Sequence, residues 1–378
     1  MTTTTMNTIN QRVEALREVM RREHLSAFIF PSTDPHNSEY VPDRWKGREW
    51  ISGFNGSAGT AVVTLHSAAL WTDSRYFLAA EQQLAGTGFQ LMKLKIAGTP
   101  TIAEWLGQEL KEEQSPEVGL DGMCNSLSCV ESLISDLRQQ GGITVRTNFD
   151  PLDQIWNNRP DIPDNPVEIQ PLEYAGETAA SKLTRIRQSL RLQHADGMLV
   201  SALDNIAWAL NLRGTDVHCN PVFVAYLLIS TTKATLYIHA EKLNDKICDY
   251  LKGQGVDTAP YEEVGKGLAD YPDYNILIDP DETSYTLAHR IRTQEMIRQA
   301  SPIPALQAVK NEAEIKGYHA AMIRDGIALV KFLHWLKPAV EAGGQTEMSI
   351  DRKLTELRSQ QPLFRDISFD TIAGYAAH

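Results

Sequence analysis

The chain has 378 residues, of which 42% are hydrophobic and 22% are charged, a balance typical of a globular protein with room for two or three domains. Its formal net charge of −12 argues against nucleic acid as a partner, because phosphate binding requires clustered lysine and arginine. The longest nearly apolar run covers residues 222–229 and is far shorter than the roughly 20 residues that cross a bilayer, so we expect no membrane partner.

The N-terminal residues and the cysteine pattern both favour a reducing compartment. The first ten residues are rich in threonine and contain no apolar segment, so no secretory signal is expected. The four cysteines include no Cys-x-x-Cys pair, and we expect each to be a free, buried thiol: Cys124, Cys129, Cys219 and Cys248. These features predict a cytoplasmic protein.

The first part of the chain predicts a mixed α/β unit. Val13, Leu16 and Met20 recur at helical spacing, and a buried strand is expected at 25–30. A glycine-rich turn at 53–59 then precedes a hairpin. The expected hairpin strands are 60–65 and 68–72, and helices are expected at 76–84, 102–113 and 129–140.

The same order of elements recurs further along the chain. A charged amphipathic helix, a short strand, a tryptophan-containing helix, a glycine break and a hairpin follow one another in both halves, with Trp208 corresponding to Trp50. The expected elements of the second half are 183–194, 197–201, 205–211, 222–230 and 234–239. We therefore predict that the second unit repeats the topology of the first.

Two proline-rich segments mark the expected domain boundaries. The first is a linker containing Pro160, Pro163, Pro166 and Pro171, and the second covers 301–304. The predicted domains are 1–155, 156–305 and 306–378.

The third part predicts a long helix, a second helix at 349–360 and a strand at 368–372. The long helix has an apolar face formed by Ile315, Tyr318, Met322, Leu329, Leu333 and Leu336. Because so small a piece cannot bury both faces of its helices, we interpret it as the opening of a larger domain.

The sequence contains no phosphate loop, no Gly-x-Ser-x-Gly elbow and no His-Glu-x-x-His motif. Its densest polar cluster runs from Thr72 to Tyr76, at the end of a predicted strand. Asp73 either caps the following helix or contributes to a site, whereas Arg75 offers a planar fork suited to a carboxylate or a carbonyl. A second cluster contains His36 in the loop 34–40, where ordinary turn chemistry is the alternative to a functional role.

Several segments, in order, resemble a known family. The segments 30–40, 52–60 and 70–77 resemble the first-domain signatures of cytosolic, three-domain Xaa-Pro aminopeptidases (aminopeptidase P). The segments 301–304 and 368–372 resemble the entrance and the opening of their catalytic domain. The chain is thereby identified as a member of the pita-bread/creatinase-like metallopeptidase family.

The resemblance implies an α/β fold with two tandem creatinase-like N-terminal domains, each a mixed sheet with flanking helices, followed by the opening helices of an incomplete pita-bread domain. It implies a homodimeric hydrolase that removes the N-terminal residue from peptides with proline second. The family's centre is two divalent metal ions, usually manganese, held by two Asp, one His and two Glu, an arrangement that suits two-metal hydrolysis.

In the family these metal ligands follow the segment 368–372, so the resemblance assigns no catalytic or metal-binding residue to this chain, His378 included. We therefore expect no metal ion in this chain and no activity from it alone. Arg75 matches a first-domain arginine that reaches toward the substrate, so it is the candidate for binding the peptide beyond its proline. Asp73 and His36 are secondary candidates for the same role.

Two other interpretations stay open. The first is a metal-free relative of the same fold that binds peptides or proteins, as the histone-chaperone members do. The second is a creatinase-type amidinohydrolase, which fits poorly because such enzymes have one N-terminal domain and this sequence predicts two.

Overall fold

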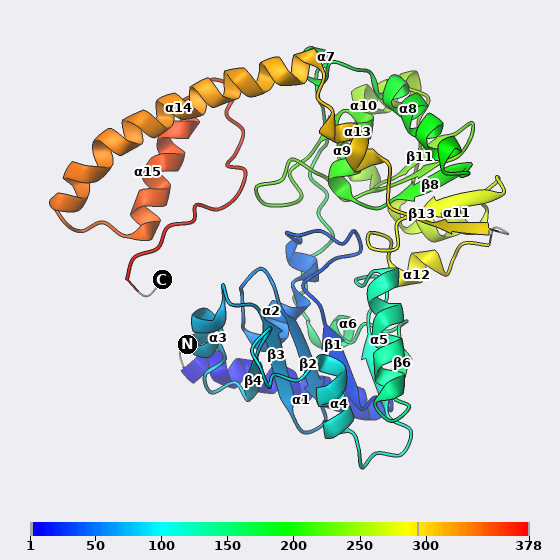
Figure 1. The fold of residues 1–378 in the computed structure, drawn as a ribbon, viewed down its shortest axis with the longest axis vertical. Helices are drawn as coiled ribbons and strands as arrows, with labels where there is room; N and C mark the ends of the chain where they lie inside the picture. Colours follow the sequence, from blue (N-terminus) through cyan, green and yellow to red (C-terminus); the bar gives the residue numbers. More distant parts are fainter. Residues whose placement is uncertain (1–2, 293–294, 377–378) are drawn as a thin grey trace.

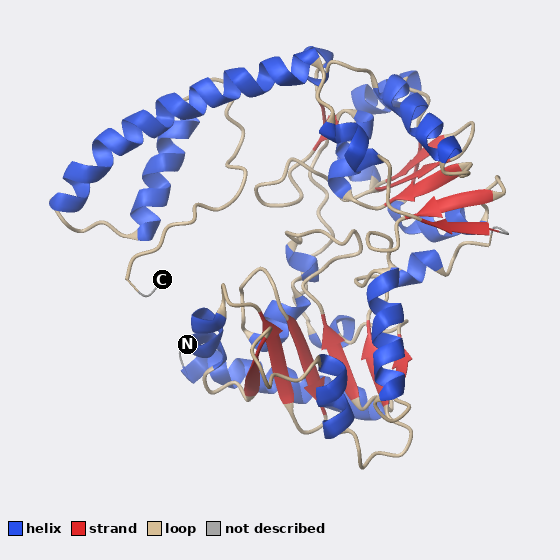
Figure 2. Cartoon of the chain, viewed as in Figure 1, coloured by secondary structure: helices blue, strands red, loops and turns tan. Residues whose placement is uncertain are grey.

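Two six-stranded mixed sheets, one after the other along the chain, dominate the computed structural model, which describes residues 3–292 and 295–376. Figure 1 shows the first sheet in blue and cyan and the second in green and yellow, with two long helices leaving the second unit in orange. Helices flank both sheets (Figure 2), which makes the fold class α/β, as the sequence predicts.

The first sheet has the strand order β4-β3-β2-β1-β5-β6. Neighbours are antiparallel between β1 and β2 and between β2 and β3, and parallel elsewhere. Alternate residues of β1 face opposite sides of the sheet, Phe28 and Phe30 packing with α1 and Ile29 packing with α4 and α5. Its strands are β1 (Ala27–Phe30), β2 (Thr60–Thr64), β3 (Ala68–Thr72), β4 (Phe89–Lys93), β5 (Glu117–Leu120) and β6 (Thr144–Arg146).

Helices cover both faces of this sheet. Both α4 and α5 begin at a side-chain cap, with Thr101 accepting from the Glu104 N–H and Ser126 accepting from the Cys129 N–H. The helices of this unit are α1 (Thr3–Arg22), α2 (Gly47–Ser52), α3 (Phe77–Leu84), α4 (Ile102–Glu109), α5 (Leu127–Gln139) and α6 (Leu152–Ile155), with the 3-10 turn η1 (Asp43–Trp45).

The second sheet repeats the first, with the order β12-β11-β10-β8-β13-β14 and the same pattern of parallel and antiparallel neighbours. Its strands are β8 (Gly197–Val200), β10 (Tyr226–Ile229), β11 (Ala234–Tyr237), β12 (Asp257–Ala259), β13 (Asn275–Ile278) and β14 (Glu295–Arg298). The predicted internal repeat is therefore confirmed. The tryptophan-containing helices also correspond, because α2 ends at Gly53 and α9 at Asn211, both with left-handed backbone.

The helices of the second unit are α7 (Leu172–Ala175), α8 (Ala179–Leu192), α9 (Leu203–Leu210), α10 (Asp245–Gly253), α11 (Val264–Ala269), α12 (Tyr285–Ala288) and α13 (Ile303–Ala308). Its 3-10 turns are η2 (Ala240–Lys242) and η3 (Tyr261–Glu263). The proline-rich segment crosses this unit's surface as a strap, and its short strand β7 (Glu168–Ile169) pairs with β9 (Leu212–Arg213). None of the helices in the described part of the chain is long and apolar enough to cross a membrane.

The C-terminal part is a helical hairpin with little core of its own. The helices α14 (Glu312–Glu341) and α15 (Glu347–Ser359) bury Ala328 and Phe332 against Leu354 and Leu357. Of the predicted apolar face, Leu329 and Leu336 pack at the edge of this cluster. The other four residues of that face are exposed: Ile315, Tyr318, Met322 and Leu333. The expectation that this piece cannot bury both faces of its helices is confirmed.

Two further expectations are wrong. Residues 368–372 form no strand, because no described strand lies beside them to complete a ladder, and Ile372 is 91% exposed. Of the four cysteines, all are free, but Cys129 and Cys248 are exposed rather than buried. Both lie on surface helices, where the apolar face of the helix decides burial and not the residue type.

The loop that follows β1 is buried between the two units. The Asp34 carboxylate accepts hydrogen bonds from the backbone N–H groups of His36 and Ser38, each at 2.9 Å. The His36 ring extends into the second unit, where Nδ1 donates to the Ser201 carbonyl at 3.0 Å and Nε2 accepts from the Tyr261 hydroxyl at 2.9 Å. The Ser201 carbonyl can only accept, so Nδ1 carries a proton, and burial lowers the pKa of His36 and favours the neutral ring. These two hydrogen bonds join the units.

A buried ion pair fixes a second element at the same junction. Lys242 in η2 donates to the Asp216 carboxylate, and both side chains are fully shielded from solvent. The same carboxylate oxygen accepts the Val224 N–H at 2.7 Å. Burial lowers the pKa of Lys242 and raises that of Asp216, so each charge depends on the other.

We predict that His36→Ala lowers the free energy of unfolding by about 2–4 kcal/mol, because it removes two interdomain hydrogen bonds and a ring that packs against Tyr226. Burial lowers the pKa of His36 from 6.5, so the unfolded state takes up a proton more readily. Stability should therefore fall as the pH drops below about 6.5.

Urea unfolding followed by tryptophan fluorescence between pH 5 and 8 measures both effects, and the variant should lose part of this pH dependence. The control is His66→Ala in the exposed β2–β3 turn, which should behave like the parent protein. A His36→Ala profile parallel to that of the parent would contradict the assignment of a neutral interdomain histidine.

Lys242→Met is expected to destabilise the second unit by about 3–5 kcal/mol, because it leaves the Asp216 carboxylate buried without its cation. Adding Asp216→Asn should recover part of the loss, because the charge disappears with its partner. Thermal unfolding of the two variants checks this, and a double variant no more stable than Lys242→Met would contradict it.

Candidate functional site

Loops that carry the sequence motifs converge at the junction of the two units. A cavity of about 350 Å³ opens there, between the loop 36–40 of the first unit and the second unit's residues 202–204, Val217 and Asn220. Burial raises the pKa of the Tyr40 hydroxyl, and the charges of Glu39 and Asp370 add to the effect. The loop after β1 and loops of the second unit therefore meet around this cavity.

Arg75 lies in the loop between β3 and α3 and is held by Asp73. Its Nε donates to one Asp73 oxygen at 2.9 Å and its Nη2 donates to the other at 2.8 Å. The Arg75 side chain is 63% exposed, and no described residue engages the opposite edge of the guanidinium, which carries Nη1. The pairing lowers the pKa of Asp73 and raises that of Arg75, so both stay charged. Asp73 thus orients an arginine whose outer edge can receive a carbonyl or a carboxylate.

The glycine-rich turn supports this loop. The Tyr76 hydroxyl lies 2.6 Å from the Ser57 hydroxyl, and its ring meets Phe54 edge-on at 5.9 Å. A Cβ atom at Gly56 would come within 2.4 Å of Phe54 and 2.8 Å of Tyr76, so the turn can approach only with a glycine there. Arg75 itself lies beside the Tyr76 ring, at 5.1 Å from its centroid. The two predicted motifs therefore form one structural unit.

His36 has different surroundings from Arg75. Its side chain is 1% exposed and both ring nitrogens are engaged between the units, as described above. Its backbone contributes to the wall of the junction cavity, so its contribution to that cavity is to hold the loop in place. The structure does not bring the His36 ring and the Arg75 guanidinium into contact.

One acidic residue at the junction, Glu282, was not predicted from the sequence. Burial raises the pKa of Glu282 to about 7, with further contributions from the nearby charges of Asp279, Asp204 and Asp281. Glu282 lines the junction cavity opposite the loop 36–40. The run Asp279–Glu282 is visible in the sequence, but an acidic turn after a strand is ordinary, and the burial depends on the distant first unit.

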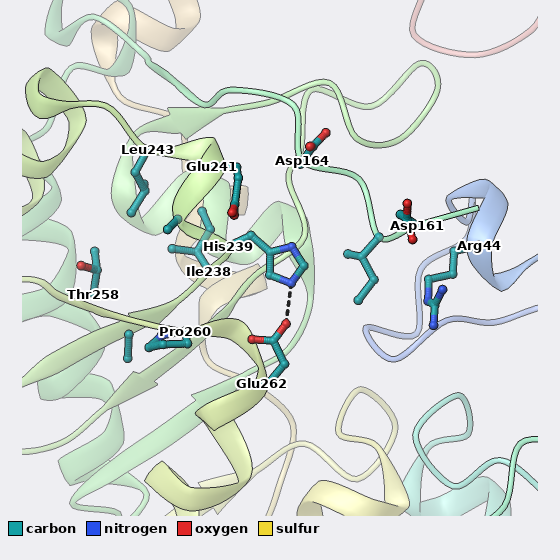
Figure 3. Close-up of a pocket in the computed structure, with 13 residues that line it drawn as sticks. Arg44, Asp161, Asp164, Ile238, His239, Glu241, Leu243, Thr258, Pro260 and Glu262 are labelled. Atoms are coloured by element: carbon teal, nitrogen blue, oxygen red, sulfur yellow. Dashed lines mark ion pairs between the residues drawn. The ribbon is translucent and has the colours of Figure 1, made fainter. Parts of the chain in front are cut away.

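A larger cavity, of about 780 Å³, lies between the strap and the second sheet (Figure 3). His239 Nε2 lies 2.8 Å from a Glu262 carboxylate oxygen across it. None of the predicted site residues lines this larger cavity. Its lining is acidic, because Arg44 is accompanied by four carboxylates: Asp161, Asp164, Glu241 and Glu262.

The described residues do not fit a two-metal centre. Within the described ranges, the group of His, Cys, Asp and Glu side chains close enough to share an ion is His218, Cys219 and Asp370. It offers one carboxylate, one imidazole and one thiol, whereas two adjacent manganese ions require several bridging carboxylates. His378 lies outside the described residues.

Comparisons with known proteins support a single family. The model of the "Creatinase/Prolidase N-terminal domain" matches twice, at residues 12–153 and 158–314. Over 98% of this chain, Xaa-Pro aminopeptidase 1 of Dictyostelium discoideum is 38% identical, and aminopeptidase P1 of Arabidopsis thaliana is 31% identical. The chain spans 60% and 64% of these two relatives' lengths.

A solved structure shares the whole arrangement. The X-prolyl aminopeptidase of Caenorhabditis elegans, described as a cytosolic enzyme with a di-nuclear active site, superposes with a TM-score of 0.91 at 30% identity. The superposition covers 97% of this chain and 62% of that protein, so both sheets and the helical hairpin correspond. The chain therefore belongs to the Xaa-Pro aminopeptidase (aminopeptidase P) family and carries two creatinase/prolidase N-terminal domains in tandem.

Proposed function

We propose that the protein to which this chain belongs is a metal-dependent Xaa-Pro aminopeptidase, which removes the N-terminal residue from peptides that have proline second. The observation that carries the proposal is the match, over nearly the whole chain, to proteins of that name. The exposed guanidinium edge of Arg75, held in place by Asp73, supports the same reading, because a peptide substrate presents carbonyl and carboxylate oxygens.

The catalytic chemistry is assigned to two divalent metal ions, manganese by the family resemblance, held outside the described residues. The di-nuclear active site of the Caenorhabditis elegans relative supports the number of ions. Such ions supply a polarised carbonyl and an activated water when bound. We propose that residues 1–155 and 156–305 form the two N-terminal domains and that 306–378 begins the pita-bread domain. By itself this chain then positions the peptide and does not cleave it.

Within this scheme, Arg75 binds the part of the peptide beyond the proline. Its fixed, charged fork can donate to a backbone carbonyl or to a terminal carboxylate without an ordering cost, because Asp73 already holds it. We also propose a cytoplasmic homodimer in which the first domain contributes to the subunit contact. The cytosolic relative and the free cysteines support the location.

The purified 378-residue chain, supplied with manganese, should release no residue from a peptide of the Arg-Pro-Pro type. The same chain extended to the length of its relatives should cleave it, and mass spectrometry of the products distinguishes the two. Metal-dependent cleavage by the 378-residue chain would refute the proposal that it only positions the peptide. An extended chain that stays inactive and instead binds histones at physiological salt would favour a metal-free binding relative.

In the extended protein, Arg75→Ala should raise KM for Xaa-Pro-Xaa peptides about tenfold, because one charge-assisted hydrogen bond contributes about 1.5 kcal/mol. kcat should change much less, since the contact lies away from the scissile bond. An Xaa-Pro dipeptide, which has no residue beyond the proline, should be affected less than a longer peptide.

The matched control is Arg21→Ala, which removes an exposed arginine from the last turn of α1. It should leave both constants unchanged. Equal losses for dipeptide and longer peptides, or an unchanged KM, would contradict the assignment of Arg75 to the part of the peptide beyond proline.

A further inference from the structure

A tight turn in the second unit carries two adjacent side chains whose atoms can bind a metal ion, those of His218 and Cys219. The Asn220 N–H donates to the Val217 carbonyl at 3.2 Å, so His218 and Cys219 occupy the two central positions of a β-turn. Cys219 has a φ of 62°, a left-handed conformation that costs a residue with a side chain about 1–2 kcal/mol. A cysteine therefore occupies a position that favours glycine or asparagine.

The turn is held from both sides. Asp216, the residue before it, is bound by Lys242 and by the Val224 N–H inside the second unit. The isolated bridge between Val217 and Asn220 closes the turn itself. The backbone of the turn at His218 and Cys219 is therefore set by contacts within the second unit.

The C-terminal segment supplies a third possible metal ligand, Asp370. The Asp370 carboxylate lies 2.9 Å from His218 Nε2, although the two residues are 152 positions apart. The imidazole nitrogen, the Cys219 sulfur and the Asp370 oxygen all lie within 4.8 Å of one another. His218 and Asp370 are exposed while Cys219 is buried, so the three donors form a half-open pocket at the surface. In Figure 1 the red C-terminal segment runs back from α15 toward this part of the second unit.

We propose that His218, Cys219 and Asp370 bind one zinc-like divalent ion, which fastens the C-terminal segment to the second unit. An imidazole, a thiolate and a carboxylate are the donor types that zinc accepts, and three protein ligands leave a fourth tetrahedral position for water. The thiolate favours a borderline-soft ion such as zinc over manganese. On binding, the Cys219 thiol gives up its proton to solvent as the sulfur–metal bond forms.

Cobalt is the first probe, because Co²⁺ accepts the same tetrahedral ligands as zinc and is coloured. We expect tag-free 378-residue protein to bind one Co²⁺ with a sulfur-to-metal charge-transfer band in the near ultraviolet, and Zn²⁺ to bleach the spectrum. Cys219→Ser should abolish the band. His218→Ala and Asp370→Asn should each weaken Zn²⁺ binding at least tenfold, since even partners of metal ligands cost about 10–100-fold when removed.

The matched controls are Cys129→Ser and Cys248→Ser, which remove exposed free thiols elsewhere in the chain and should leave the band and the affinity unchanged. Asp370→Asn keeps the test valid if a substitution at the buried Cys219 impairs folding, because Asp370 is exposed and its side chain supports no core.

Trypsin cleavage gives a second readout. Arg365, whose side chain is 81% exposed, lies in the segment that the ion would fasten. Zn²⁺ should slow cleavage there severalfold in the parent protein and have no effect in Asp370→Asn. A cobalt spectrum without the sulfur band, Zn²⁺ affinity unchanged in Cys219→Ser or Asp370→Asn, or cleavage at Arg365 indifferent to Zn²⁺ would overturn the proposal and leave a simple contact between His218 and Asp370.

Discussion

The burial of Asp34 and His36, in the loop that follows β1, is the constraint on which the junction depends. Asp34 shapes the loop by accepting two of its backbone N–H groups, and the His36 ring fills a site made by Ser201 and Tyr261 of the second unit. An imidazole that must donate at one nitrogen and accept at the other is restricted to one tautomer, so the contact fixes orientation as well as distance. The chain continues directly from this loop to Tyr40, and the position of the junction cavity follows from it.

The helix, strand and hairpin that open each unit were predictable because their signals are local. Hairpin strands joined by a three- or four-residue turn, and helices that begin at Thr101 or Ser126, are specified by residues within a few positions of each other. The other strands of each sheet were not predicted: β4, β5 and β6 in the first, and β12, β13 and β14 in the second. The edge strands β6 and β12 are three residues long and contain no buried residue, so their extended backbone depends on a neighbouring strand that a sequence pattern does not reveal.

Only part of the candidate site could be predicted, namely the part whose residues lie close together in the sequence. Asp73 and Arg75 are two positions apart, so their motif could be identified, although the choice between helix capping and a paired carboxylate required coordinates. His36 contacts residues 165 and 225 positions away, which is why turn chemistry and function could not be separated from its sequence. The expected strand at 368–372 had the right residues for a ladder but lies beside no strand of the described ranges, and Ile372 faces solvent.

The two units contribute differently to the junction. The first supplies the loop 36–40 to the junction cavity, while its glycine turn supports the separate loop that carries Arg75. The second supplies a turn anchored by a buried ion pair. The C-terminal segment reaches that turn at Asp370, whose charge is also felt at Tyr40 of the first unit. Asp370 is one point where the third part of the chain meets the second unit, and the ion pair between Arg365 and Glu168 is another. Whatever fixes the Asp370 carboxylate therefore helps to hold that part against the second unit. A contact to a rigid turn can do this with one hydrogen bond, and a shared metal ion would do it with three bonds.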